Sequence, residues 1–149
     1  MKISILLSIP KTLLFNLLHL PLRQALKVPI WIHCRAKTNV RGKVTIENSI
    51  HTAMIRIGFH TCPECNPADE TRLSISTGGV LRFDGTAHLG RGSKIIVATN
   101  ALMELGDNFA ISASSTIVSY KKIVFGRDIQ FSWDCLVMDS NTYDIYNEG

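Results

Sequence analysis

The chain has 149 residues, of which 46% are hydrophobic, and a formal net charge of +4; this is the size of one domain with a packed core. The charge is uneven, because residues 1–45 contain eight Lys and Arg and no acid, whereas the remainder contains eight Lys and Arg and all 12 acids. This distribution favours contact with an anionic membrane surface and argues against nucleic-acid binding, since basic residues are not interleaved with stacking aromatics.

Residues 1–27 form an apolar and basic beginning that we expect not to span a membrane. The first ten residues lack the small-residue cleavage site of a signal peptide. Lys11, Asn16, His19 and Arg23 interrupt the apolar run before the roughly 20 residues of a membrane span are complete. With four scattered cysteines and no clear signal peptide, we expect a cytoplasmic protein, placed there freely or at the inner face of the membrane.

Within this beginning, residues 11–27 are predicted to form one or two short amphipathic helices that Pro21 breaks or kinks. Four leucines fall near one helical face: Leu14, Leu17, Leu18 and Leu22. One interpretation is a helical cap over the open end of a coiled β structure. The other is peripheral docking on an anionic membrane, and the two can coexist.

Residues 28–58 contain three β-rich pieces and are predicted to form an early, irregular coil. Val40 and Ile46 stand six residues apart within it. Residues 59–72 are polar and contain two prolines, so we expect a loop that interrupts the winding and serves as a lid or an arm between subunits.

From Leu73 onward the sequence repeats with a period of six residues. The aliphatic or aromatic residues at this spacing are Phe83, Leu89 and Ile95; Leu105, Ile111 and Ile117; and Phe125, Phe131, Val137 and Tyr143. A period of six fits neither a helix nor a hairpin meander, but it suits a chain wound around a triangular prism. The two longer steps, Ile95 to Leu105 and Ile117 to Phe125, are predicted to be insertions at corners. Glycine, asparagine and aspartate should occupy the corners because they tolerate unusual backbone angles.

These repeats resemble the left-handed β-helix of hexapeptide-repeat acyltransferases, and more closely the O-acetyltransferases of bacterial capsule and exopolysaccharide biosynthesis. The matching segments are IPKTLLFNLLHLPLRQALKVPIWI, LGRGSKIIV, LGDNFAISASSTI and IVFGRDIQFSWDCLVMDSNTYDI. The fold expected is all-β, a left-handed parallel β-helix over residues 28–149 with a helical segment at 1–27. Members of this family continue for several more coils, so the chain resembles a form that lacks the last coils of the acetyl-CoA groove.

The resemblance implies a homotrimer with active sites between subunits, acetyl-CoA as donor, a sugar or glycan hydroxyl as acceptor, and no metal. A histidine removes the proton of the hydroxyl in such enzymes. In the family this histidine follows a Met-Asp pair, in a motif like M-D-x-D-x-H. Here Met138 and Asp139 match, Asn141 stands at the second aspartate, and Tyr143 stands at the histidine. Tyrosine is largely protonated at neutral pH and is a poor general base.

Other residues are candidates on their own chemistry. Trp133 and Asp134 precede the Met-Asp motif by one strand, and an aromatic ring beside a carboxylate is a common sugar-binding pair. Cys62 and Cys65 form a C-x-x-C pair next to His60, which fits either zinc or ordinary loop residues. His88 lies inside the repeats, as a catalytic group or as a surface histidine.

The sequence therefore predicts an acetyl-CoA-dependent O-acetyltransferase acting on a sugar hydroxyl in surface polysaccharide biosynthesis. Its site would contain Tyr143 and Asp139 as catalytic residues and Trp133, Asp134 and Asn141 as substrate-binding residues. The alternative is a catalytically inactive relative that acts as a structural or sugar-binding subunit, because Tyr143 replaces the histidine and the chain stops early relative to the family.

Overall fold

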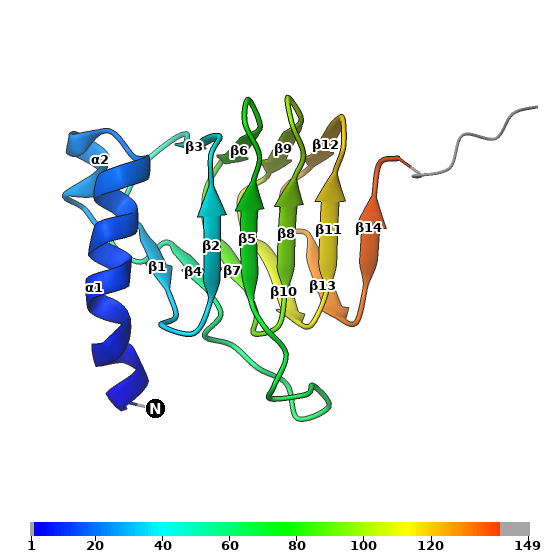
Figure 1. The fold of residues 1–149 in the computed structure, drawn as a ribbon, viewed down its shortest axis with the longest axis horizontal. Helices are drawn as coiled ribbons and strands as arrows, with labels where there is room; N and C mark the ends of the chain where they lie inside the picture. Colours follow the sequence, from blue (N-terminus) through cyan, green and yellow to red (C-terminus); the bar gives the residue numbers. More distant parts are fainter. Residues whose placement is uncertain (1, 141–149) are drawn as a thin grey trace, which may run out of the picture.

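The computed structural model, which describes residues 2–140, is a parallel β-helix of about five coils with helices at one end (Figure 1). Sheet A contains β1 (Ile30–Ile32), β4 (Ile55–Ile57), β7 (Ala87–Leu89), β10 (Phe109–Ala113) and β13 (Gln130–Trp133). Sheet B contains β2 (Lys37–Val40), β5 (Arg72–Ile75), β8 (Lys94–Val97), β11 (Thr116–Ser119) and β14 (Leu136–Met138). Sheet C contains β3 (Lys43–Ile46), β6 (Val80–Phe83), β9 (Leu102–Leu105) and β12 (Lys122–Phe125).

The winding is left-handed, as the sequence predicted. In Figure 1 the strands of sheet B rise at the front, the chain crosses the top toward sheet C at the rear and returns along sheet A, while successive coils advance to the right. Leu73, Ile95 and Ile117 pair in register on sheet B and stand 22 residues apart. Each coil therefore places one strand on each face of a three-sided prism.

The six-residue spacing corresponds to the step from one face to the next. Phe83, Leu89 and Ile95 lie on sheets C, A and B in turn, and all three are buried. The longer steps fall where sheet B passes to sheet C, at the turns before β9 and β12, which confirms the predicted corner insertions. Because the extra residues lie in a turn, the inward face of each strand is unchanged.

The core is a stack of aliphatic and aromatic side chains along the prism axis. Leu89, Leu105, Ile111 and Ile117 are at most 2% exposed, as expected. Phe125 is only partly buried, since it belongs to the last described coil, where it packs against Phe109 and Phe131 with ring centroids 5.1 and 5.5 Å away.

The corners use glycine and asparagine for different reasons. Asn108 and Asp128 have φ of 57° and 59°, which is the left-handed region predicted for them. Gly90 has no such angle; instead, a Cβ there would lie 1.8 Å from the carbonyl oxygen of Ser112 on the next coil. The requirement at Gly90 is close stacking of two backbones, which the sequence pattern did not distinguish from a backbone-angle requirement.

Helix α1 (Lys2–His19) begins well before the predicted residue 11; it covers the end of the prism and packs on β1, in agreement with the cap interpretation. Its polar side chains bond to the exposed edge of β1. Asn16 accepts from the Ile30 N–H at 3.2 Å and donates to the Ile30 carbonyl at 2.7 Å. Thr12 accepts a hydrogen bond from the Ile32 N–H at 3.0 Å. Ser8 accepts one from the N–H of Cys34, two residues further along the chain, at 2.8 Å.

Ser8, Thr12 and Asn16 form a polar ladder along the strand edge. The three contacts fit because the axial spacing of these helix residues is close to that of alternate strand residues. Residues four apart on a helix are about 6 Å apart along its axis, and residues two apart on a strand are about 6.6 Å apart. Asn16, Thr12 and Ser8 therefore meet alternate residues, Ile30 and Ile32 of β1 and then Cys34 beyond it, and all three side chains are buried. A free strand edge that would otherwise expose unpaired amides and carbonyls is satisfied by side chains.

The leucines of α1 face away from the core. Leu14, Leu17 and Leu18 are 56–67% exposed. The helix thus packs through its polar face, the reverse of an ordinary amphipathic helix. Pro21 separates α1 from α2 (Leu22–Ala25), as predicted, whereas Pro10 lies inside α1 without ending it. No helix among the described residues is long and apolar enough to cross a membrane.

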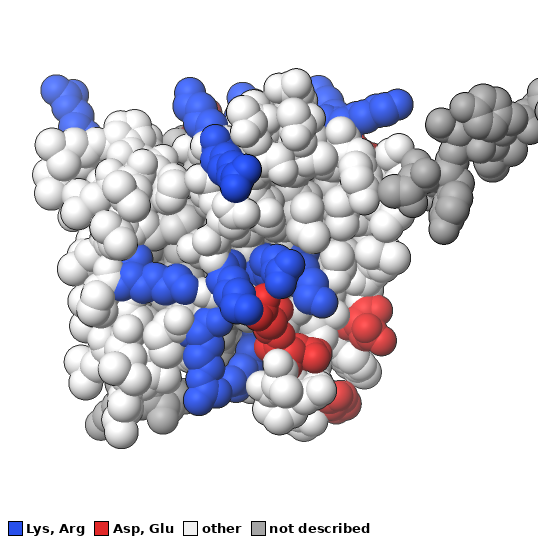
Figure 2. Space-filling model, in the orientation of Figure 1, with Lys and Arg blue, Asp and Glu red and all other residues white. Residues whose placement is uncertain are grey.

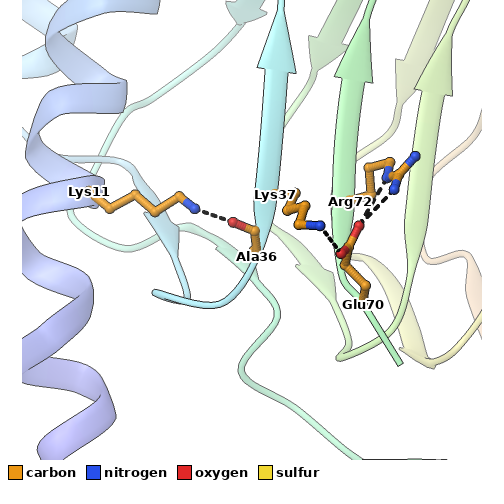
Figure 3. Close-up of polar contacts among 5 residues, drawn as sticks. All are labelled: Lys11, Ala36, Lys37, Glu70 and Arg72. Atoms are coloured by element: carbon orange, nitrogen blue, oxygen red, sulfur yellow. Dashed lines mark hydrogen bonds and ion pairs between the residues drawn. The ribbon is translucent and has the colours of Figure 1, made fainter. Parts of the chain in front are cut away.

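The predicted loop joins β4 to β5 and lies at the corner between sheets A and B (Figure 1). Glu70 fixes its end by pairing with Lys37 and Arg72, which are register neighbours on sheet B (Figure 3). Lys11 of α1 donates to the Ala36 carbonyl just before β2 (Figure 3). Asp69 accepts a hydrogen bond from Ser114 at 2.7 Å, so the loop is held to both early and late coils.

Replacing Asn16 by leucine should lower the free energy of unfolding by about 2–4 kcal/mol, because the buried N–H and carbonyl of Ile30 lose their partners. The matched control is Leu17→Ala on the exposed face, which should change stability by less than about 0.5 kcal/mol. Urea unfolding followed by circular dichroism measures both. Equal stability of the two variants would contradict the role of the polar ladder.

Candidate functional site

The outward side chains of sheet A form one row that crosses all five strands. Register pairing aligns them in the order Trp31, Arg56, His88, Ala110 and Gln130. The row thus presents, in order along one face, an indole ring, a guanidinium, an imidazole and an amide. A small residue, Ala110, lies between the imidazole and the amide. The repeat itself creates this alignment, because each coil contributes one residue at the same height on the strand.

Three adjoining hollows follow this row. One has a volume of about 610 Å³ and is lined by His60, His88, Asn108, Ala110, Ile111, Ser112, Gln130, Phe131 and Ser132. A smaller hollow shares His60 and His88 with it and adds Arg56 and Phe59. A third hollow of about 520 Å³ shares Arg56 and Phe59 and extends to Trp31, His33 and Arg91. We call the three together the sheet A groove.

The loop between β4 and β5 forms part of the wall of the groove. The Arg91 N–H donates to the His60 carbonyl at 2.6 Å, which holds this part of the loop against the β7–β8 corner. Phe59 packs edge-on against His33 with ring centroids 5.3 Å apart, and lies 6.4 Å from Trp31. The aromatic end of the groove is therefore built by residues from two coils and the loop.

Small residues lie next to His88 on two neighbouring coils. Gly90 follows β7, and the coil above it carries Ser112 at the equivalent height. Since a Cβ at Gly90 would meet the Ser112 carbonyl, only glycine fits there. Gly90 thus allows the backbones of two neighbouring coils to stack closely beside His88.

Electrostatics in the groove favour a neutral His88. Partial burial in the groove lowers the pKa of His88, and the charges of Arg56 and His60 lower it further. A neutral imidazole is the form that accepts a proton. His33, at the aromatic end, has a pKa that burial and then the charges of Arg91, Arg35 and Lys11 hold below its ordinary value. The same cations make this end attractive to anions.

Asp139, predicted to be catalytic, holds the turn between β11 and β12. Its carboxylate accepts from the N–H groups of Tyr120, Lys121 and Lys122 at 2.6–2.9 Å and from the Ser119 hydroxyl at 3.3 Å. Partial burial acts to raise the pKa of Asp139, but these hydrogen bonds outweigh it and hold the pKa below its usual value. The structure thus gives Asp139 a role in the corner, and its part in catalysis stays a prediction.

The remaining predicted residues lie at the last described coil or outside it. Trp133 ends β13 and is 47% exposed, and Asp134 follows in the corner with φ of 55°. Neither lines the sheet A groove, although Ser132 beside them does. Asn141 and Tyr143 lie outside the described residues. The predicted set is therefore not brought together around the groove, and its roles stay predictions.

Cys62 and Cys65 are joined by a disulfide within the loop, with Cα atoms 5.5 Å apart. Paired in this way, their sulfur atoms are not thiolate ligands. Within residues 2–140, no group of three or more His, Cys, Asp or Glu side chains is placed to hold a metal ion.

Comparison with protein-family models, with curated proteins and with solved structures gave no match to this chain. Function is therefore inferred from the fold and the sheet A groove.

His88 should titrate below the ordinary histidine pKa of 6.5 and so be neutral at pH 7. Because the folded state disfavours the protonated form, its contribution to stability should be lost as pH falls below 6.5 through the folded pKa. Imidazole NMR measures the pKa directly. Arg56→Gln should raise it, whereas Arg72→Gln on sheet B should leave it unchanged. An unchanged pKa in Arg56→Gln would contradict the electrostatic coupling.

Proposed function

We propose that the protein is an acyltransferase that moves the acetyl group of acetyl-CoA to a sugar hydroxyl in the sheet A groove. The observation that carries this proposal is His88, which lines an open groove and whose pKa is lowered by its surroundings. The left-handed β-helix and the resemblance of the repeats to hexapeptide acyltransferases support the same class of reaction. A fold alone does not determine function, so the groove is the stronger support.

In the proposed reaction His88 acts as general base. Its neutral imidazole accepts the proton of the acceptor hydroxyl while the oxygen attacks the thioester carbonyl carbon. The tetrahedral adduct collapses with loss of the CoA sulfur, which takes the proton back from the imidazolium. The products are an acetyl ester and free CoA thiol, and no covalent enzyme intermediate is needed.

The aromatic end of the groove suits the donor. Acetyl-CoA carries an adenine ring and several phosphates, and this end offers Trp31 and Phe59 beside Arg56 and Arg91. Guanidinium groups pair with phosphate oxygens, and aromatic rings stack on bases. Donor binding here places the thioester toward His88, one coil further along the row.

The opposite end of the groove suits a sugar. Asn108, Ser112 and Gln130 present amide and hydroxyl groups that hydrogen-bond to hydroxyls, and Phe131 adds apolar surface. Trp133 and Asp134, the predicted sugar-binding residues, follow on the same strand and its corner. We therefore place the acceptor between His88 and the β13 end.

A specific observation also favours a second candidate, a glycan-binding subunit without catalysis. The carboxylate of Asp139 is occupied by four hydrogen bonds in its corner, and the family's histidine position is held by Tyr143. Such a protein would bind the acceptor without consuming acetyl-CoA.

The His88→Gln variant should lose acetyl transfer by at least about a hundredfold, which is the usual contribution of a general base. The assay is release of free CoA thiol from acetyl-CoA with a panel of hexoses and hexosamines. His51→Gln is the matched control, since His51 is exposed and lies outside the groove. Tyr143→Phe tests the alternative base.

The outcomes separate the candidates. Loss in His88→Gln with retention in His51→Gln and Tyr143→Phe supports the proposed base. Loss only in Tyr143→Phe would move catalysis to the predicted motif. Sugar binding without thiol release in the native protein, and no calorimetric heat with millimolar acetyl-CoA, would favour the glycan-binding subunit.

The proposed enzyme is a homotrimer, because a groove that is open along one side is completed when a neighbouring subunit covers it. Light scattering at micromolar concentration should give three times the mass of the chain. A monomer under these conditions would contradict the trimer while leaving the assignment of His88 to be decided by the transfer assay.

A further inference from the structure

The helical end of the molecule presents a broad apolar surface to solvent. The large hydrophobic side chains of α1, α2 and the residue after α2 that are at least 44% exposed are Ile3, Leu6, Leu7, Leu13, Leu14, Leu17, Leu18, Leu22 and Leu26. We call this set the leucine face. In Figure 2 the left end of the molecule, which these helices form, is uncharged over most of its length.

The leucine face is not needed to hold the coils together. Helix α1 packs on β1 through Ser8, Thr12, Asn16 and Phe15, which lie on the opposite side of the helix and are buried. Scattered surface leucines are ordinary, but a contiguous stripe of them on one helix marks a surface that another apolar phase covers. The stripe therefore needs an occupant outside the described chain.

The charged residues of the segment that carries the leucine face are all of one sign. Arg23 and Lys27 are exposed beside Leu22 and Leu26, and no acidic residue occurs before Glu47. Two copies that met through this face would bring these cations together without an acid on the same helices, which opposes association. A bilayer with anionic lipid has an apolar interior and negatively charged headgroups. It therefore complements both the leucines and the cations.

The shape of the face fits a flat surface. Helix α1 lies across the end of the β-helix, perpendicular to the direction in which the coils advance (Figure 1). Its 18 residues extend about 27 Å. We propose that the leucine face docks on a bilayer that contains anionic lipid, with α1 lying in the interface and the β-helix standing on the membrane. The finding that no described helix can span a membrane agrees with such interfacial contact.

The test is flotation of the full chain with vesicles of equal parts phosphatidylcholine and phosphatidylglycerol. The protein should bind these vesicles, and binding to pure phosphatidylcholine should be weaker. The double variant L14E/L18E should weaken binding by at least about a hundredfold, since each leucine loses apolar burial. Arg23→Gln with Lys27→Gln should weaken binding to the anionic vesicles by about thirtyfold and remove its salt dependence.

The matched control is V124E/L136E, which places two acids on exposed apolar residues of the last described coil. It should bind vesicles like the native protein. Circular dichroism establishes that each variant is folded, and the Arg23 and Lys27 pair provides a second test should L14E/L18E fail to fold.

Several results would overturn the proposal. Absence of binding to anionic vesicles would do so, as would equal binding by the native protein, L14E/L18E and the variant with Arg23→Gln and Lys27→Gln. If L14E/L18E instead converts an oligomer to a monomer by light scattering and the native protein ignores vesicles, the occupant is a second copy of the chain.

Discussion

The structure depends on how the first strand of the β-helix is terminated. In a parallel β-helix each coil pairs with the next, so the outer edge of the first coil has amides and carbonyls without strand partners. On sheet A, side-chain oxygens and nitrogens of Asn16 and Thr12 meet the edge of β1, and the Ser8 hydroxyl meets the amide of Cys34, two residues beyond the strand. Helix α1 thereby takes the place of a preceding strand. Every later coil, including the one that carries His88, stacks on this starting edge.

The same pairing explains why α1 is turned with its leucines outward. Buried polar groups are favourable only when they are hydrogen-bonded, and the strand edge supplies the partners. Once Thr12 and Asn16 face β1, the geometry of a helix places Leu14, Leu17 and Leu18 on other sides. One helix therefore both closes the fold and presents an apolar surface. The helix rotation that satisfies the strand edge therefore also determines which side chains face outward.

Much of the fold could be predicted from the sequence, because the six-residue spacing of Phe83, Leu89 and Ile95 is a direct record of the three faces. The groove could not. His88 and Ala110 stand 22 residues apart, like other register neighbours, whereas Arg56 precedes His88 by 32 because the loop intervenes. This irregular interval hid the alignment of Arg56 with His88. The leucine periodicity of α1 predicted a helix, but only the spacing of Ser8, Thr12 and Asn16 carried information about which side packs.

The register of sheet A also sets how far each strand lies from α1. Neighbouring strands lie about 4.8 Å apart, so two steps from β1 to β7 place His88 roughly 10 Å beyond the first strand, in the direction away from α1. This elevation depends only on the number of coils and is insensitive to the residues that fill the core. Insertion or deletion of one whole coil below His88 would shift the imidazole by about 5 Å relative to α1. A β-helix of this kind is therefore a spacer of fixed rise, in which the number of coils determines the distance of His88 from α1.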